Sequence, residues 1–584
     1  MPPWPGRTAL RRCSSARLPY CAAYKTAYQS VAFLQGVFLR VSSNSLQTTG
    51  VAICVQRGHL LLSGLLILPC SLVTLFPSPL LPIASIMARD TQFYRSQIGE
   101  SSVIDYSHTD FPLKLFFKDV YYFFVYIWAL PWIVWPMFPS GPKEFNELAI
   151  TWPNLYCVVL HTILAIMQLL FILSLPFTVF FPIWMVALGI SVFMVVNWVF
   201  CRMLNGGHGT YESDEKYAEA LPEHAHEQWI FLNGVAVGQH WMQGNLNRLA
   251  LTFGRPVLGI HNRTSGIVFD VVECLIQRNF SYATGDIRIC FKLVRDVLYN
   301  PRKTKVIFVL HSQGGIEGSL VLDWLLQELP QDLLSKLEVY TFGNAANHFN
   351  NPHRHNKSQS LSKHKPLAAM NTVMTETTYE SPANGPEDAT MGVKVNIAPT
   401  LEKTPSFSST RAISAAKDRA IGHIEHYAHC TDFVSIWGVL HFATNRMGSR
   451  ELPRFLGRLF ARSHGRGGHQ FNQHYLDGMF PLKFNERTNM YEGADDNSEF
   501  MNEIIKIGAE GDAMANAREA FEISWAGTHG FGSGEILTPV EVHGLAHKKR
   551  YAGEVRVKDL SRLWSYRNGM IPQDGGVLRT SAAV

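Results

Sequence analysis

A serine at the junction between an apolar run and a helical pattern is the residue of this chain best suited to covalent chemistry. The stretch KVIFVLHSQGG (305–315) reads as a buried strand that turns sharply into a helix at Ser312. A serine hydroxyl becomes a nucleophile only when a base removes its proton and its Oγ is held accessible. A strand-to-helix elbow does the second job and offers the N–H groups of a helix start to a developing oxyanion.

The elbow departs at one position from the G-x-S-x-G pattern that such turns favour. Gly314 follows Ser312 at the required spacing, but Leu310 stands where the earlier glycine is expected. A large side chain at that position must find room against the adjacent strand. We expect His311, beside the serine, to pack rather than to act as the base.

A second loop could complete a site for the oxyanion. The stretch IFLNG (230–234) ends an early strand in Asn-Gly, and the turn after it can aim a backbone N–H at the serine. We expect the N–H of Gly234 or Val235 to act together with that of Gln313. A plain Asn-Gly turn without this role is the alternative interpretation.

Strands alternate with helices around these residues, which indicates an α/β fold with a mostly parallel sheet and helices on both faces. The predicted strands lie within 229–238, 256–262, 305–311 and 337–349, and the predicted helices within 240–254, 266–277, 283–300 and 314–329.

The region 229–349 resembles the core of the alpha/beta-hydrolase superfamily and is most similar to its lipase-like serine esterases. The stretch VYTFGNAANHF (339–349) resembles the strand that follows the elbow helix in fungal lipases, where Tyr-Thr-Phe-Gly recurs. The likeness extends to 421–482 and leaves the apolar runs and the C-terminal region unexplained. The two matching regions also resemble an uncharacterised group of fungal membrane-anchored hydrolase-like proteins. The resemblance implies a catalytic triad in the chain order serine, acid, histidine.

The acid that the resemblance implies is Asp432. It ends the strand in IGHIEHYAHCTDF (421–433) and precedes apolar residues, as the acid of lipase-like hydrolases does. Glu425 is the reserve. An aspartate that only caps the next helix is the plain alternative.

The histidine that the resemblance implies lies in GRGGHQFNQHYLDGMFPL (465–482). His474 stands before Tyr-Leu in a loop-then-helix setting like that of the family's histidine, and His469 is the reserve. The two are five residues apart and lack the i, i+4 spacing of a helical zinc pair. This chemistry requires neither a metal nor an organic cofactor, and two histidines that merely pack are the alternative.

The first half of the chain is apolar in blocks. The run 155–200 contains no Asp, Glu, Lys or Arg, and a spanning helix needs about 20 apolar residues. The run therefore predicts two spans, near 156–175 and 182–200, joined by a tight reversal. A third candidate, 120–138, is rich in Tyr and Trp and either crosses the membrane or lies among the headgroups.

Composition divides the rest of the chain. Residues 1–86 contain no Asp or Glu and represent either a transit-like segment or an extension that precedes a true start at Met87. The other expected regions are a membrane region (87–201), a linker (202–228), two parts of the hydrolase-like domain (229–349 and 421–485), a disordered insertion (350–420) and a helical C-terminal extension (486–584).

Bulk composition narrows the function classes. The net charge is only +5 over 584 residues, and no basic stripe favours a nucleic-acid partner. Nine scattered cysteines argue against a disulfide framework and for a reducing compartment. The two predicted spans indicate an integral membrane protein, and we expect an internal membrane, either the endoplasmic reticulum or the mitochondrion.

The sequence therefore predicts a membrane-anchored serine hydrolase that cleaves a carboxylic ester of a lipid or acyl chain. The alternative is a hydrolase-like membrane scaffold without turnover, which recruits partners through the insertion 350–420. Leu310 at the elbow is the feature that favours the scaffold.

Overall fold

The structure is a computed structural model, and the residues it describes lie in the larger of two compact units of the chain, 78–584. They are 91–94, 111–137, 144–364, 373–379, 408–414, 418–444, 455–463, 467–505 and 556–572. The predicted N-terminal extension lies outside them.

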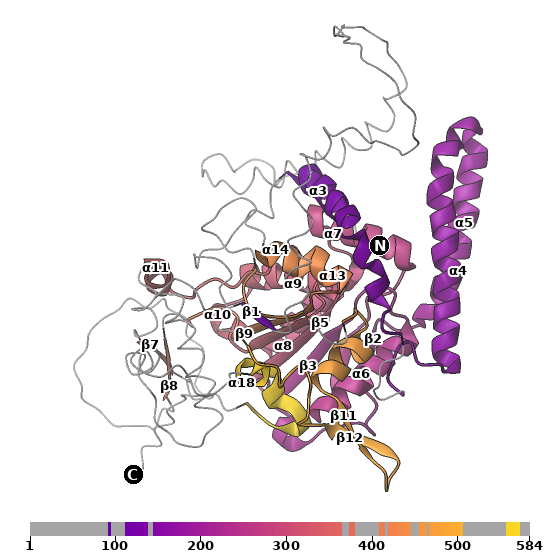
Figure 1. Ribbon diagram of the computed structural model, residues 1–584. Helices are drawn as coiled ribbons and strands as arrows, with labels where there is room; N and C mark the ends of the chain where they lie inside the picture. Colours follow the sequence, from indigo (N-terminus) through magenta and orange to yellow (C-terminus); the bar gives the residue numbers. More distant parts are fainter. Residues whose placement is uncertain are drawn as a thin grey trace, which may run out of the picture. The chain divides into compact units, whose positions relative to one another are not determined.

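An eight-stranded, mostly parallel sheet organises this unit (Figure 1). The six central strands are parallel, and the edge strands β1 and β2 are antiparallel to their neighbours. Across the sheet the order is β1 (Gln92–Tyr94), β10 (Arg458–Arg462), β9 (His423–His429), β6 (Leu337–Phe342), β5 (Lys305–His311), β3 (Glu227–Leu232), β4 (Val257–Ile260) and β2 (Thr210–Glu212). The carboxyl ends of the six parallel strands share one edge, and the predicted mixed α/β fold is confirmed.

The central strands are apolar on both faces because each face is covered. Phe308 of β5 belongs to the core on one side of the sheet, and Val309 belongs to the core on the other. The first core is completed by α7 (Ile267–Phe280), α8 (Gly285–Tyr299) and α9 (Gln313–Glu328), and the second by α6 (Gln239–Phe253), α18 (Val557–Leu560) and the 3-10 helix η9 (Leu563–Gly569).

Two long apolar helices form a hairpin, α4 (Trp152–Ser174) and α5 (Ile183–Asn205), joined by the 3-10 helix η4 (Leu175–Phe180) (Figure 1). Each helix has 23 residues and is long and apolar enough to cross a membrane. At the connection, Phe180 is 79% exposed. The two predicted spans thus correspond to two helices whose outer surface is apolar and uncovered.

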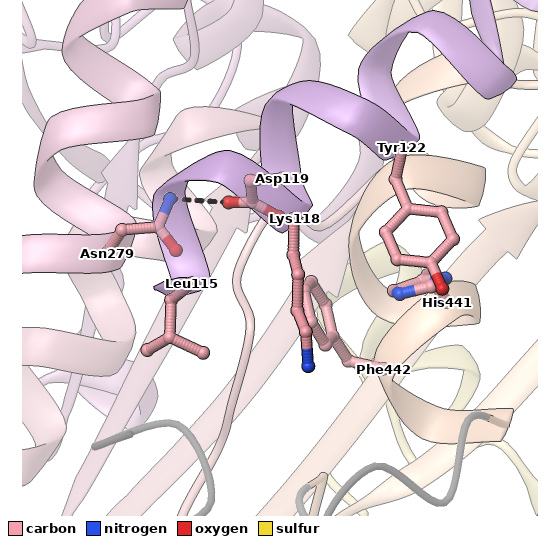
Figure 2. Close-up of a pocket in the computed structure, with 7 residues that line it drawn as sticks. All are labelled: Leu115, Lys118, Asp119, Tyr122, Asn279, His441 and Phe442. Atoms are coloured by element: carbon pink, nitrogen blue, oxygen red, sulfur yellow. Dashed lines mark hydrogen bonds between the residues drawn. The ribbon is translucent and has the colours of Figure 1, made fainter. Parts of the chain in front are cut away.

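The third predicted span, 120–138, is not one helix. Helix α3 (Pro112–Val125) ends inside it and the 3-10 helix η3 (Ile127–Ile133) follows, and each is shorter than the roughly 20 residues that a span requires. A charge also fixes α3 to the globular part, because Asp119 forms a buried ion pair with Arg278 at 2.7 Å. Its carboxylate also accepts a hydrogen bond from Asn279 (Figure 2). The prediction that this segment lies among headgroups stays open.

Three of the predicted regions contain strands and short helices that the sequence does not predict. The linker 202–228 includes strand β2, which pairs with β4, and the 3-10 helix η5 (Pro222–His224). The insertion 350–420 includes α11 (Asn356–His364) and an antiparallel pair, β7 (Val373–Tyr379) and β8 (Ser408–Ser414). The extension 486–584, expected to be helical, contains β12 (Met490–Ala494), which pairs with β11 (Leu482–Asn485). Strand β2 has only three residues, fewer than the four to eight over which alternation can be read, and β7, β8 and β12 do not alternate between apolar and polar side chains.

Short helices connect the larger elements. They are α10 (Gln331–Leu334), α13 (Phe433–Ser435), the π-helix η7 (Ile436–Leu440), α14 (His441–Thr444), the π-helix η8 (Phe471–Leu476) and α15 (Asp477–Met479).

Candidate functional site

The chain turns sharply at Ser312, between β5 and α9. Ser312 has φ 57° and ψ −121°, a conformation that side-chain-bearing residues rarely adopt. Its N–H donates to the Phe342 carbonyl at 3.0 Å, and its own carbonyl accepts from Ala345 at 3.2 Å. Gly234 approaches so closely that a Cβ there would collide with the serine side chain. The predicted elbow is therefore present, and its strain is held by backbone contacts with the next strand.

The structure also explains how Leu310 fits where a glycine was expected. Leu310 is fully buried, and its side chain occupies the space beside Gly318 of α9. A Cβ on Gly318 would collide with the Leu310 methyl groups. The small residue that the elbow needs is thus supplied by the helix after the serine instead of by the strand before it.

A carboxylate and an imidazole meet beside the elbow. Asp432, which follows β9, accepts a hydrogen bond at Oδ2 from His469 Nδ1 at 2.9 Å. The same oxygen accepts from the hydroxyl groups of Tyr475 at 2.8 Å and Ser435 at 2.9 Å. His469 Nε2 is buried, and no group among the described residues bonds to it.

Several contacts bring this pair to the serine. The rings of His311 and His469 stack with their centroids 4.8 Å apart, and His311 Nε2 donates to the His469 carbonyl. Gly343 directly follows Phe342, which accepts the hydrogen bond of Ser312, and a Cβ on Gly343 would touch both His469 and Asp432. Serine, acid and histidine therefore follow three strands of one sheet and gather at the shared carboxyl edge.

The expected pairing of His474 with Asp432 is not found. His474 lies inside η8, where its Nδ1 accepts from the Gln470 N–H at 2.9 Å and its Nε2 lies 3.0 Å from the Pro136 carbonyl. Both ring nitrogens are occupied, so we correct the histidine from His474 to the reserve His469.

The reserve acid Glu425 is also remote from the pair. It lies near the start of β9, where its carboxylate accepts from His423 at 2.8 Å and from the backbone N–H of Arg562 at 2.7 Å. Glu425 thus fixes the C-terminal segment to the sheet.

The predicted oxyanion donors lie beside the serine. Gln313 is the first residue of α9, so its N–H has no carbonyl one turn earlier in the helix. Its side chain is clamped, accepting from Asn262 at 2.9 Å and donating to Gln277 at 3.0 Å. Gly234 contacts the serine, as described above, and Val235 begins the turn that follows.

Burial and hydrogen bonding set the charges of the site. Burial alone would raise the pKa of Asp432, but His469 and the two hydroxyl donors lower it to about 2. Burial and the neighbouring His469 lower the pKa of His311 to about 3. The acid is therefore ionised at neutral pH and His311 is neutral.

Other parts of the described structure do not suggest a competing site. Among the described residues, no group of three or more His, Cys, Asp or Glu side chains is arranged to hold a metal ion. Figure 2 shows a small pocket between α3, α7 and α14, lined by Leu115, Lys118, Asp119, Tyr122, Asn279, His441 and Phe442. None of these seven residues belongs to the serine site.

Comparison with known proteins adds no assignment: no family model, curated protein or solved structure matches the chain.

The sequence did not indicate the residues that support Asp432, and it favoured His474 where the structure pairs His469 with this carboxylate. Tyr475 and Ser435, which bond to Asp432, carry no recognisable motif. A signal for His469 was present, because two glycines precede it and η8 begins two residues after it. The loop-before-helix setting assigned to His474 belongs to His469 once the start of that helix is known.

Proposed function

We propose that this protein is a membrane-anchored serine hydrolase of the alpha/beta-hydrolase type that cleaves a carboxylic ester of a lipid or acyl chain. The observation that carries the proposal is the strained Ser312, whose chain neighbour His311 stacks on the imidazole of a buried Asp432–His469 pair. In this mechanism Ser312 attacks the carbonyl carbon, and His469 Nε2 takes the hydroxyl proton and returns it to the leaving alcohol. Water then cleaves the acyl-enzyme through the same histidine.

The other groups supply orientation and charge. Asp432 holds Nδ1 of His469, which keeps Nε2 available as the base and stabilises the imidazolium that forms. The N–H groups of Gln313 and of Gly234 or Val235 bind the oxygen of the tetrahedral intermediate. The strand order of the sheet, with the serine after a central strand, supports the alpha/beta-hydrolase assignment.

The surroundings favour an amphiphilic substrate. The apolar hairpin of α4 and α5 keeps the site near a membrane. Close to the site, the Ile133 carbonyl accepts the N–H of His469, and this segment exposes large aromatic side chains such as Phe124, 62% exposed, and Trp135, 55% exposed. Aromatic residues of this kind favour the headgroup layer. Because Ser312 is 2% exposed, an ester reaches it only after a neighbouring segment moves.

The scaffold alternative loses its main support. It rested on Leu310 at the elbow, and Gly318 provides the room that this side chain needs.

Ester hydrolysis by the full-length protein in lipid nanodiscs tests the proposal, with p-nitrophenyl esters of increasing acyl length as substrates. We expect turnover that increases with acyl length and falls by about a thousandfold or more in Ser312→Ala. Ser319→Ala is the control, because Ser319 is also buried in α9 but, within the described part of the chain, bonds only to the Ile316 carbonyl. Absence of hydrolysis with every ester, or full activity in Ser312→Ala, would overturn the proposal.

A further inference from the structure

The loop between β4 and α7, residues 261–266, lies between the apolar hairpin and the turn that carries the predicted oxyanion donors. Hydrogen bonds reach it from both sides, and each set involves buried polar side chains.

On the hairpin side, two amides converge on one carbonyl. Gln168 of α4 donates to the Ser265 carbonyl at 2.6 Å, and Asn197 of α5 donates to the same oxygen at 3.3 Å. Gln168 also donates to Asn197 at 2.8 Å. Both side chains are buried in helices whose other faces are apolar and exposed. Polar groups in such helices are costly unless they are bonded, so these contacts fix how the hairpin meets the loop.

A third amide makes a reciprocal contact near the end of α5. Asn205 donates to the Thr264 carbonyl at 2.7 Å and accepts from the Thr264 N–H at 3.0 Å. This pair fixes the backbone of Thr264 against the hairpin.

On the site side, one buried carboxylate joins the loop to the turn. Asp270 accepts from the hydroxyl of Thr264 at 2.7 Å, from the N–H of Ser265 at 2.8 Å and from the N–H of Ala236 at 2.9 Å. Ala236 has a positive φ of 58°, so its conformation needs such support. It lies two residues after Gly234, and its position sets that of the turn.

The loop also reaches the other predicted donor. Asn262 donates its backbone N–H to Asn233 at 2.9 Å and its side-chain amide to Gln313 at 2.9 Å. Both sides of the predicted oxyanion site therefore depend on the position of residues 261–266.

We propose that this loop couples the seating of the hairpin to the geometry of the oxyanion turn, with Gln168, Asn197 and Asp270 as positioning residues. A hairpin that is correctly seated in a bilayer holds Ser265 and Thr264 in place, and Asp270 transmits this placement to Ala236. The kinetic part of the inference rests on the proposed function, whereas the structural part does not.

The test compares the full-length protein in nanodiscs with the double variant Gln168→Met/Asn197→Leu. Both replacements are close in size and more apolar, so the hairpin keeps its preference for the bilayer while both hydrogen bonds to Ser265 are lost. Ser191→Ala is the matched control, because Ser191 of α5 is exposed and, among the residues that the structure describes, bonds only to the Ala187 carbonyl. Hydrogen exchange of 233–238 and hydrolysis of a short soluble ester are measured.

We expect exchange at 233–238 to accelerate by about threefold or more in the double variant. We also expect kcat to fall by about tenfold with KM changed by less than about twofold, because misplaced oxyanion donors weaken binding of the transition state more than that of the ester. The control should match the wild type in both. Faster exchange at 261–266 with exchange at 233–238 and kcat unchanged would overturn the coupling. If the wild type hydrolyses no ester, the proposed function fails, and the exchange at 233–238 alone decides the coupling.

Discussion

At the scale of single residues, the conformation of Ser312 is the feature most in need of explanation. A side-chain-bearing residue at φ 57° and ψ −121° costs about 1–3 kcal/mol, and such strain persists only where neighbours impose it. Backbone bonds to Phe342 and Ala345 impose it here. These bonds hold the serine where β5 ends, one residue after His311, whose ring stacks on that of His469. This arrangement supports the proposed catalytic role.

The choice between two histidines gives the first residue-scale prediction. Replacing His469 with Gln removes the proposed base, and we expect kcat for ester hydrolysis to fall by about a thousandfold or more. His474→Gln loses packing and a hydrogen bond to Pro136, so we expect a lower melting temperature with kcat retained within about tenfold. Kinetics and thermal unfolding of both purified variants check this. The reverse ranking would contradict the assignment of His469.

A pH dependence follows from Glu147, which holds the segment after His469. Glu147 accepts from the N–H groups of Asn472 at 2.8 Å and Gln473 at 3.2 Å. Burial raises its pKa from 4.5 to about 7, although these N–H groups oppose the shift. The folded state therefore retains a proton that the unfolded state loses, so stability falls as pH rises from about 4.5 to about 7, by about 3 kcal/mol at most.

Glu147→Gln should remove this dependence. Between about pH 5 and pH 8, we expect the melting temperature of the wild type to fall further than that of the variant. The difference between the two falls is the contribution of Glu147, because the other titrating groups are the same in both proteins. Parallel melting curves of the two proteins would contradict the proposed linkage.

At the scale of elements, the packing of β5 against α9 replaces the expected glycine pattern. Leu310 and Gly318 form a large–small pair, so we expect Gly318→Ala to lower the free energy of unfolding by about 1–3 kcal/mol. The double variant Leu310→Ala/Gly318→Ala should be more stable than the sum of the single effects predicts. Gly244→Ala in α6 is the control, because a Cβ there meets no atom within 4 Å. Additive effects in chemical unfolding would show that the two positions are independent.

The sequence predicts elements best where apolar patterns are long. The strands and helices from β3 to β6 agree with prediction within a few residues, because buried parallel strands read as continuous apolar runs. The candidate segment 120–138 contains parts of two shorter helices, and apolar composition could not reveal the ion pair of Asp119 with Arg278, 159 residues away, that fixes the first of them. His474 was preferred to His469 because the start of η8 was unknown. Asp270 and Gly318 act through contacts that only the folded chain creates, and no local pattern marks them.

At the scale of the whole molecule, an apolar hairpin and an α/β sheet belong to one compact unit. The outer faces of the hairpin are exposed at Leu170 (62%) and Val195 (61%), which water would disfavour and a bilayer would cover. The proposed reaction fits this arrangement, because lipid esters lie in the same membrane.

We therefore predict that the full chain is inserted in a membrane through this hairpin. We expect the wild type to resist extraction by alkaline carbonate, and Leu170→Arg/Val195→Arg to lose this resistance, since an arginine costs up to about 3 kcal/mol within a spanning helix. Leu221→Arg is the control, because Leu221 is also exposed but lies outside the hairpin. Release of the wild-type protein by carbonate would contradict a spanning hairpin.

The most direct test of the central claim is to treat the full-length protein in nanodiscs with a fluorophosphonate and to map the adduct by mass spectrometry. We predict one stable phosphonyl group on Ser312, formed much more slowly in His469→Gln and at a rate near that of the wild type in His474→Gln. Folded wild-type protein that stays unlabelled at Ser312, or that labels equally fast without His469, would contradict it.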